Sequence, residues 1–152
     1  MTPRFVILDR DGVINVDSDD YIKSPDEWLP IDGSLQAIAD LNRHGFKIAV
    51  ITNQSGISKS LFDLDTLQAM HDKMQHLVKA TGGYIEAIYF CPHAPSVQCQ
   101  CRKPGIGMYQ QFATEYGVKL SEVYAVGDSY RDLEAAQRCH AKPILVKTGK
   151  GL

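Results

Sequence analysis

Two aspartates lie two residues apart in the sequence Asp9-Arg10-Asp11-Gly12-Val13-Ile14-Asn15. In extended chain, such residues project to the same side. One carboxylate can attack phosphorus to form an acyl-phosphate, and its neighbour can exchange protons with the leaving alcohol and the attacking water. A solvated acidic turn is the alternative. A calcium loop is disfavoured because the downstream glutamate and the flanking helices are missing.

Carboxylates need cations before they can approach a phosphate dianion. Mg²⁺ is the hard ion that suits carboxylates together with phosphate oxygens. Asp128 is a candidate for a further ligand and Lys103 for a fixed positive charge. Thr52 is a candidate hydrogen-bond donor to phosphate, with the backbone N–H groups of residues 53–56 beside it. Together these residues predict a magnesium-dependent phosphate site.

Three cysteines and one histidine form a second cluster, Cys91-Pro92-His93 followed by Cys99-Gln100-Cys101. Three thiolates and one imidazole make a tetrahedral zinc set with no open position, which predicts a structural ion. A chance cluster or a redox pair is the alternative. Zinc would pin this loop, within residues 91–101, and aim Arg102 and Lys103 at the site. Cys139 has no partner in this scheme.

Short apolar runs alternate with helical patterns along the chain, which predicts parallel βαβ units in a three-layer α/β sheet. We expect one domain over residues 1–152, with a loop at 148–152. Asp9, Thr52, Cys91 and Asp128 each lie at or just past the end of an apolar run, and such ends share one edge of a parallel sheet. The expected strands are 5–8, 48–51, 85–90, 123–126 and 143–146, and the expected helices are 34–44, 65–79, 108–116 and 131–139.

The bulk composition is that of an ordinary globular protein. The chain has 152 residues, of which 44% are hydrophobic and 22% charged, with a net charge of −2. This charge gives no reason to expect a nucleic-acid or membrane partner. No apolar run approaches the roughly 20 residues that span a bilayer, and the N-terminus does not resemble a signal peptide. We therefore expect a cytoplasmic protein. We also expect it to be a monomer.

The ordered set Asp9-x-Asp11-Gly12, Thr52, Lys103 and Gly127-Asp128 resembles the four motifs of the haloacid dehalogenase superfamily of phosphatases. The resemblance implies a Rossmann-like fold with Asp9 as nucleophile and Asp11 as general acid/base. It implies Mg²⁺ held by the Asp9 carboxylate, the Asp11 backbone carbonyl and Asp128. We expect Asp132 to orient Lys103 or to support the metal ligands. Receiver domains use similar residues, but in a different order along the chain.

The zinc pattern narrows this resemblance. Together with Thr52-Asn53-Gln54-Ser55-Gly56-Ile57 and Cys101-Arg102-Lys103-Pro104, it is similar to the heptose-bisphosphate phosphatases, which release the 7-phosphate of a sugar. Histidinol-phosphate phosphatases share the zinc loop but usually carry aspartate at the position of Ser55. The zinc loop stands in for the large cap domain of other relatives. Its middle segment, residues 94–98, is shorter than in many heptose enzymes, which would alter the substrate rim.

The same resemblance implies a set of substrate contacts. Short polar side chains in the loop at residues 17–20 suit a polyhydroxylated sugar, although a solvated turn is the alternative. Arg102 is placed to clamp a distal phosphate. Tyr21 and Trp28 are candidates for the mouth of the site, whereas histidines 44, 71, 76 and 140 are interpreted as surface or cap residues. The expected substrate contacts are Asp17, Ser18, Asp19, Asp20, Asn53, Gln54, Ser55, Arg102, Lys103 and Ser129.

Other functions fit the sequence less well. Besides histidinol phosphate, a broad range of small phosphate esters remains open as substrate. A non-catalytic zinc-stabilised module that binds phosphorylated ligands would not need both Asp9 and Asp11. A nucleic-acid 3′-phosphatase would need a basic groove that tracks a strand, and no such pattern is present.

Overall fold

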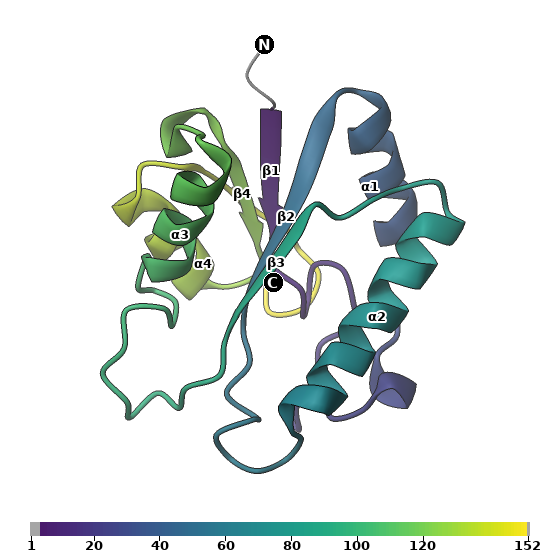
Figure 1. Cartoon of the computed structure of the whole chain (residues 1–152), viewed down its shortest axis with the longest axis vertical. Helices are drawn as coiled ribbons and strands as arrows, with labels where there is room; N and C mark the ends of the chain where they lie inside the picture. The colour runs from purple at the N-terminus through teal and green to yellow at the C-terminus, as the bar shows by residue number, and fades with distance from the viewer. Residues whose placement is uncertain (1–3, 152) are drawn as a thin grey trace.

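The computed structural model describes residues 4–151 and has one parallel sheet of five strands in the order β3-β2-β1-β4-β5. Figure 1 shows α1 and α2 on one face of the sheet and α3 and α4 on the other. The elements are β1 (Arg4–Leu8), η1 (Pro25–Glu27), α1 (Ser34–Arg43), β2 (Phe46–Asn53), α2 (Leu64–Ala80), β3 (Ala87–Cys91), α3 (Gly107–Tyr116), η2 (Leu120–Glu122), β4 (Tyr124–Gly127), α4 (Tyr130–Arg138) and β5 (Lys142–Leu145).

The central strand β1 is apolar on both sides because both of its faces are covered. Phe5 and Ile7 belong to a core that includes Phe112 of α3. Val6 and Leu8 alternate with them and belong to a second core on the opposite face, with residues of α1 and α2. This alternation is what a strand between two helical layers requires. The predicted three-layer α/β sheet is confirmed.

Two helices, α2 and α4, begin with side-chain caps, and the cap of α4 also holds a residue of the site. The Asp63 carboxylate accepts a hydrogen bond from the Thr66 N–H at the start of α2. Ser129 and Asp132 form a capping box at the start of α4. A capping box pairs the N-cap and the third helical residue reciprocally, so it fixes both side chains. The position of Asp132 therefore follows from the local rules for starting a helix.

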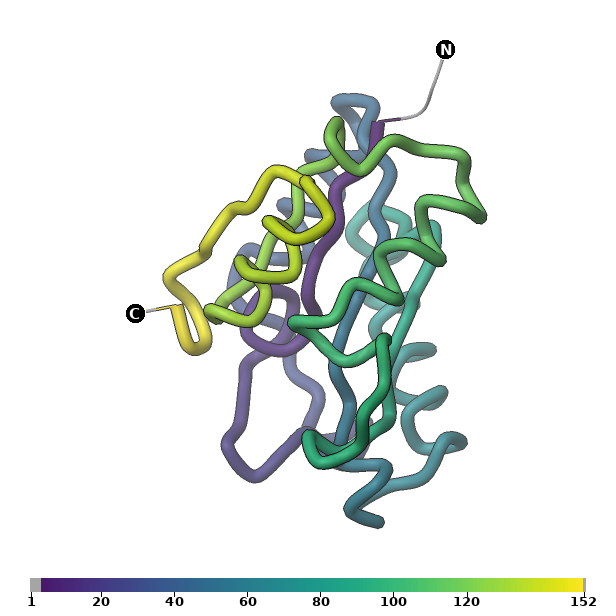
Figure 2. The backbone as a smooth tube through the Cα atoms, turned by 90° about the vertical axis from the view of Figure 1, so that its left-hand side faces the viewer, coloured from purple at the N-terminus to yellow at the C-terminus, as the bar shows by residue number. Residues whose placement is uncertain are grey.

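The carboxyl ends of the strands meet at one end of the molecule, as predicted. Figure 2 shows the long connections that follow β1, β2 and β3 gathered at this end. The segment from residue 148 to residue 151 is a loop, as expected, whereas Leu152 and residues 1–3 lie outside the described part. Among residues 4–151, no helix has the length and apolar character needed to cross a membrane.

Several expectations need correction. β3 begins at Ala87 instead of residue 85, although Ile85 remains fully buried. Trp28 does not line the mouth of a site, because its side chain is 0% exposed and packs in the core beneath α1 and α2. His71 is not a surface residue, since only 4% of it is exposed. Both errors come from tertiary contacts that bury loop and helix residues far apart in the chain.

Candidate active site

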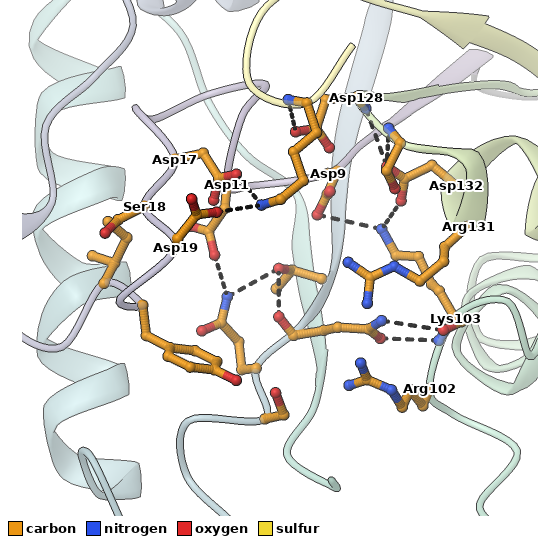
Figure 3. Close-up of a pocket in the computed structure, with 18 of the residues that line it drawn as sticks. Asp9, Asp11, Asp17, Ser18, Asp19, Arg102, Lys103, Asp128, Arg131 and Asp132 are labelled. Atoms are coloured by element: carbon orange, nitrogen blue, oxygen red, sulfur yellow. Dashed lines mark hydrogen bonds and ion pairs between the residues drawn. The ribbon is translucent and has the colours of Figure 1, made fainter. Parts of the chain in front are cut away.

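Asp9 and Lys103 meet at the carboxyl edge of the sheet (Figure 3). Asp9 follows β1, and its backbone N–H donates to the carbonyl of Val126 in β4 at 3.0 Å. The Lys103 ammonium lies 3.3 Å from Asp9 Oδ1 and 2.8 Å from Asp132 Oδ1, and the lysine is only 2% exposed. Lys103 is therefore a buried cation shared between two carboxylates, in agreement with the expectation that Asp132 orients it.

The two carboxylate oxygens of Asp9 have different surroundings. Oδ1 accepts the Arg10 N–H at 2.8 Å and faces Lys103, whereas Oδ2 receives no hydrogen bond from the described residues. Burial raises the pKa of Asp9 to about 7, Lys103 opposes this shift, and the neighbouring carboxylates add to it. An additional cation would favour the ionised form that a nucleophile needs.

The Asp11 carboxylate is held by donors on both of its oxygens. Arg10 Nε donates to Oδ1 at 2.8 Å, and Asn15 Nδ2 donates to the same oxygen at 2.9 Å. Gln54 Nε2 donates to Oδ2 at 3.2 Å and also to Thr52 Oγ1 at 3.0 Å. Arg10 is fully buried, so its guanidinium acts inside the protein. These contacts fix the orientation of the Asp11 carboxyl group at the edge of the sheet.

His71 of α2 contacts this network through the side chain of Arg10. Its Nε2 lies 3.3 Å from Arg10 NH1. Burial, followed by the positive charge of Arg10, lowers the pKa of His71 to about 3. A neutral imidazole can accept the arginine N–H, and the facing donor assigns Nε2 as the acceptor nitrogen. No sequence motif marks this histidine, because its polar contact is with the side chain of Arg10.

Asp128 and Asp132, just after β4, make different contacts. Asp132 Oδ2 accepts the backbone N–H groups of Asp128 and Ser129 at 3.1 and 3.2 Å, and Oδ1 accepts Lys103. Its oxygens are therefore occupied. Asp128 is left to face Asp9, and the three carboxylates supply oxygens within 4.8 Å of one another. This oxygen set fits a hard divalent cation such as Mg²⁺, with Asp9 and Asp128 as its carboxylate ligands.

The loop that carries Lys103 is tied directly to the end of β2. Asn53 Oδ1 accepts the Lys103 N–H at 2.9 Å, and Asn53 Nδ2 donates to the Lys103 carbonyl at 3.3 Å. Both polar atoms of this side chain are thus used in holding the lysine. Asn53 lines the cavity, as expected, but its amide positions Lys103.

The predicted zinc ligands come together in the loop after β3. Cys91 Sγ lies 3.7 Å from Cys99 Sγ and 3.4 Å from His93 Nδ1, which lies 3.2 Å from Cys101 Sγ. A tetrahedral zinc ion with Zn–S bonds of about 2.3 Å separates its sulfurs by about 3.8 Å. The four donors therefore fit one zinc ion. The four cysteines of the chain, including Cys139, are free thiols in the structure.

The carboxylates and Lys103 open into a cavity of about 280 Å³. Of the expected contacts, Asp20 alone is not on its wall and is exposed. Pro95 of the zinc loop reaches the wall, as a substitute for a cap would. The lining residues are Asp9, Asp11, Asp17, Ser18, Asp19, Tyr21, Ile22, Thr52, Asn53, Gln54, Ser55, Pro95, Arg102, Lys103, Asp128, Ser129, Arg131, Asp132 and Lys150.

Arg131 is a cavity residue that sequence reasoning missed. It stands in the first turn of α4 and lies beside Arg102 (Figure 3). Burial and the neighbouring Arg131 charge lower the pKa of Arg102. Neither arginine has a salt-bridge partner among the described residues. A basic residue is unfavourable near a helix N-terminus, and this local conflict was the signal that could have found it.

A protein-family model described as haloacid dehalogenase-like hydrolase matches residues 4–140. The matched range contains Asp9, Asp11, Lys103 and Asp128, and it includes the whole zinc loop.

Two curated relatives resemble the chain along nearly its full length. The D-glycero-beta-D-manno-heptose-1,7-bisphosphate 7-phosphatase of Pseudomonas aeruginosa is 53% identical over 152 residues, which are 100% of this chain and 85% of the relative. The protein of the same name from Bordetella bronchiseptica is 52% identical over 148 residues, which are 97% of this chain and 83% of the relative.

Solved structures agree with the sequence relatives. The crystal structure of D,D-heptose 1,7-bisphosphate phosphatase from B. bronchiseptica, complexed with magnesium and phosphate, matches with a TM-score of 0.95 at 52% identity. The match covers 97% of this chain and 83% of that one. The enzyme of that name from Burkholderia thailandensis matches with a TM-score of 0.75 at 44% identity, over 97% of this chain and 81% of that one.

Proposed function

The chain belongs to the haloacid dehalogenase-like hydrolases, and we propose that it removes the 7-phosphate of D-glycero-β-D-manno-heptose 1,7-bisphosphate. The observation that carries this proposal is the charge distribution of the cavity. Asp9, Asp11 and Lys103 form one end, and Arg102 and Arg131, which have no ion-pair partner among the described residues, lie on its wall. A substrate with one phosphate to lose and a second phosphate to hold matches such a cavity.

In the first step, a carboxylate oxygen of Asp9 attacks the phosphorus of the 7-phosphate. A bond forms between this oxygen and phosphorus, and the bond from phosphorus to the C7 oxygen breaks. Asp11 gives its proton to the departing C7 oxygen, so the sugar leaves as an alcohol. Oδ2 of Asp9 is the freer oxygen for this attack, since Oδ1 already accepts the Arg10 N–H and faces Lys103.

In the second step, water attacks phosphorus and displaces the Asp9 carboxylate. Asp11, now ionised, takes a proton from this water, and inorganic phosphate leaves. Arg10, Asn15 and Gln54 hold Asp11 in the orientation that serves both steps. Lys103 balances negative charge next to Asp9, and Thr52 lies on the cavity wall as a hydrogen-bond partner for phosphate oxygens.

Magnesium fits the oxygen donors at this edge. We propose that the Asp9 carboxylate, the Asp11 backbone carbonyl and Asp128 hold it. When bound, Mg²⁺ would neutralise charge on the phosphoryl oxygens and favour ionised Asp9. Asp132 supports this arrangement by holding the backbone N–H of Asp128 and the ammonium of Lys103.

We further propose that residues 4–151 act as one catalytic domain with a structural zinc ion bound by Cys91, His93, Cys99 and Cys101. Arg102 directly follows the last zinc ligand, and its NH1 donates to the His93 carbonyl at 3.5 Å. A zinc ion would therefore fix the arginine as well as the loop.

The proposal is tested with purified protein by measuring phosphate release from both anomers of heptose 1,7-bisphosphate, from heptose 7-phosphate and from histidinol phosphate. The expected result is the highest kcat/KM for the β-bisphosphate, dependent on Mg²⁺ and lost in Asp9→Asn. Histidinol phosphate lacks a second phosphate for Arg102 and Arg131. If it were hydrolysed with equal or higher kcat/KM, the substrate assignment would be wrong.

A further inference from the structure

A short segment near the C-terminus, Thr148-Gly149-Lys150, lies across the carboxyl edge of the sheet and touches the site from outside the family's motifs. We call these three residues the strap. Figure 1 shows this part of the chain, in yellow, beside the connection that follows β1. The hydroxyl of Thr148 donates to the carbonyl of Gly12 at 2.7 Å, which ties the strap to the loop of Asp9 and Asp11.

The strap also contacts the metal-ligand candidate Asp128. The backbone N–H of Lys150 donates to Asp128 Oδ2 at 2.9 Å. This bond engages one carboxylate oxygen and leaves the other for a cation. A ligand carboxylate that is oriented by an outer hydrogen bond binds its metal in a defined geometry.

The backbone at the middle of the strap passes very close to these groups. Gly149 has φ +57°, and a Cβ built there would lie 2.2 Å from Asp128 Oδ2 and 2.6 Å from Gly12 Cα. Gly12 has φ +86°, and its own Cβ would lie 2.0 Å from Asp128 Oδ2. Two glycines therefore let three backbone segments meet around one carboxylate. Any larger residue at position 149 must displace the strap, Asp128 or both.

The side chain of Lys150 acts on the other wall of the cavity. Its ammonium forms an ion pair with Asp17 Oδ2 and lies 3.8 Å from Asp19 Oδ1. Both aspartates line the cavity, next to the catalytic carboxylates. Without a nearby cation, this acidic wall would repel an incoming bisphosphate. Lys150 offsets part of this negative charge and holds the loop at residues 17–20 against the body of the protein.

We infer that the strap is a positioning element for this active site, in which its backbone orients Asp128 toward the divalent cation and its lysine holds the substrate loop and offsets part of its negative charge. We call the role of the strap backbone at Asp128 the backbone half and the role of the Lys150 side chain the lysine half, and each is tested separately. The backbone half concerns cation binding and does not need a substrate. The lysine half deepens the proposed function and rests on it.

The backbone half is tested by titrating Mg²⁺ into substrate-free protein by calorimetry. Gly149→Ala is expected to weaken Mg²⁺ binding by about tenfold, the usual loss when an outer partner of a metal ligand is removed. Gly117→Ala is the matched control, because Gly117 has φ +62° and no atom within 4 Å of its built Cβ. It imposes a similar backbone strain without touching the site and should bind Mg²⁺ as the wild type does.

Thr148→Val provides a second test that keeps the backbone freedom of Gly149. It removes the hydrogen bond to Gly12 and is expected to weaken Mg²⁺ binding in the same direction by a smaller factor. If Gly149→Ala does not fold, as judged by circular dichroism, Thr148→Val decides alone. Mg²⁺ binding in these variants equal to that of Gly117→Ala would overturn the backbone half.

The lysine half is tested by steady-state kinetics on heptose 1,7-bisphosphate. Lys150→Met is expected to raise KM by about threefold or more, the scale of a partly exposed ion pair, with kcat nearly unchanged. Lys150→Arg should restore KM, because it keeps the charge, and Lys147→Met controls for the loss of an exposed lysine nearby. An unchanged KM in Lys150→Met would overturn this half. If wild-type protein does not hydrolyse the bisphosphate at all, the proposed function fails, and the Mg²⁺ titrations still decide the role of the strap.

Discussion

Lys103 approaches Asp9 to 3.3 Å in a part of the protein where the lysine is 2% exposed, and the same ammonium lies 2.8 Å from Asp132. Its charge compensates two carboxylates that burial would otherwise drive to protonate. Burial lowers the pKa of a lysine, but Asp9 and Asp132 outweigh this and raise the pKa of Lys103 above its usual range. The lysine therefore stays charged at neutral pH, and its charge favours the ionised form of Asp9.

Replacing Lys103 should damage both stability and catalysis. Lys103→Met leaves two buried carboxylates without their cation, and breaking such a pair costs about 3–5 kcal/mol of unfolding free energy. Urea unfolding and phosphate release measure the two effects. Lys23→Met removes a partly exposed pair with Glu27 and is the control, with a loss of about 0.5 kcal/mol. Equal losses of unfolding free energy in the two variants would contradict the role of Lys103 as a cation shared by Asp9 and Asp132.

The pKa of Asp9 predicts a pH-dependent stability in the absence of Mg²⁺. The pKa is about 7 in the folded protein and 3.8 in the unfolded chain, so the folded state binds this proton more tightly. The resulting stabilisation is complete below the unfolded pKa and is lost as pH rises through about 7. The side chain of Asp9→Asn does not titrate. The free energy of unfolding of this variant should therefore rise relative to that of wild type between pH 5 and pH 8.

The difference in unfolding free energy between Asp9→Asn and wild type should change by on the order of 2 kcal/mol between these two pH values. Urea unfolding of wild type and Asp9→Asn at the two pH values, without added Mg²⁺, measures it. Added Mg²⁺ should then stabilise wild type more than Asp9→Asn, because the ion favours the carboxylate. A difference between the two proteins that is the same at pH 5 and pH 8 would show that Asp9 does not titrate in this range.

Arg131 should distinguish bisphosphates from monophosphates. Arg131→Ala removes one guanidinium of the pair with Arg102, and a charge-assisted contact of this kind contributes about 1.5–3 kcal/mol, or roughly 10- to 150-fold in binding. We expect KM for heptose 1,7-bisphosphate to rise within this range and KM for heptose 7-phosphate to stay nearly constant. Arg138→Ala, in the last turn of the same helix, is the control. A parallel rise for both substrates would place the distal phosphate elsewhere.

Loss of zinc should act on the substrate side of the site before it acts on the core. Cys101→Ser removes a ligand next to Arg102 and should lower the zinc content and raise KM while the sheet remains folded. Cys139→Ser is the matched control, because Cys139 lies at the end of α4 away from the cluster. Metal analysis measures the zinc content, steady-state kinetics measure KM, and circular dichroism checks that the sheet remains folded. A fully active Cys101→Ser without zinc would remove the structural role of the ion.

Much of the fold, and the meeting of the candidate site residues at one edge, could be predicted from the sequence because the signals were local. The apolar runs ended at polar residues, and parallel strands bring such ends to one edge. Asp9, Thr52 and Asp128 were found in this way. The short spacings within the zinc cluster likewise identified a metal loop, and the structure brings Cys91 and Cys101 together.

The remaining features depend on contacts between distant segments, which no local pattern contains. Trp28 lies in a loop, yet the core beneath α1 and α2 buries it completely. His71 lies on a helix with an ordinary pattern and acts only through Arg10. Lys150 reaches Asp17 across 133 positions of sequence. Arg131 gave a weak signal, since a basic residue in a first helical turn opposes the helix dipole.

Trapping the phosphorylated enzyme tests the account most directly. Asp11→Asn should form the bond between Asp9 and phosphorus slowly, because no acid protonates the departing oxygen, and should hydrolyse it more slowly still, because no base activates the water. Rapid quenching with heptose 1,7-bisphosphate and mass spectrometry of the peptides measures the intermediate. We predict one phosphoryl group per chain, on Asp9, with heptose 1-phosphate as the released product. Turnover with no phosphoryl group on Asp9, or near-full activity in Asp9→Asn, would contradict Asp9 as the nucleophile.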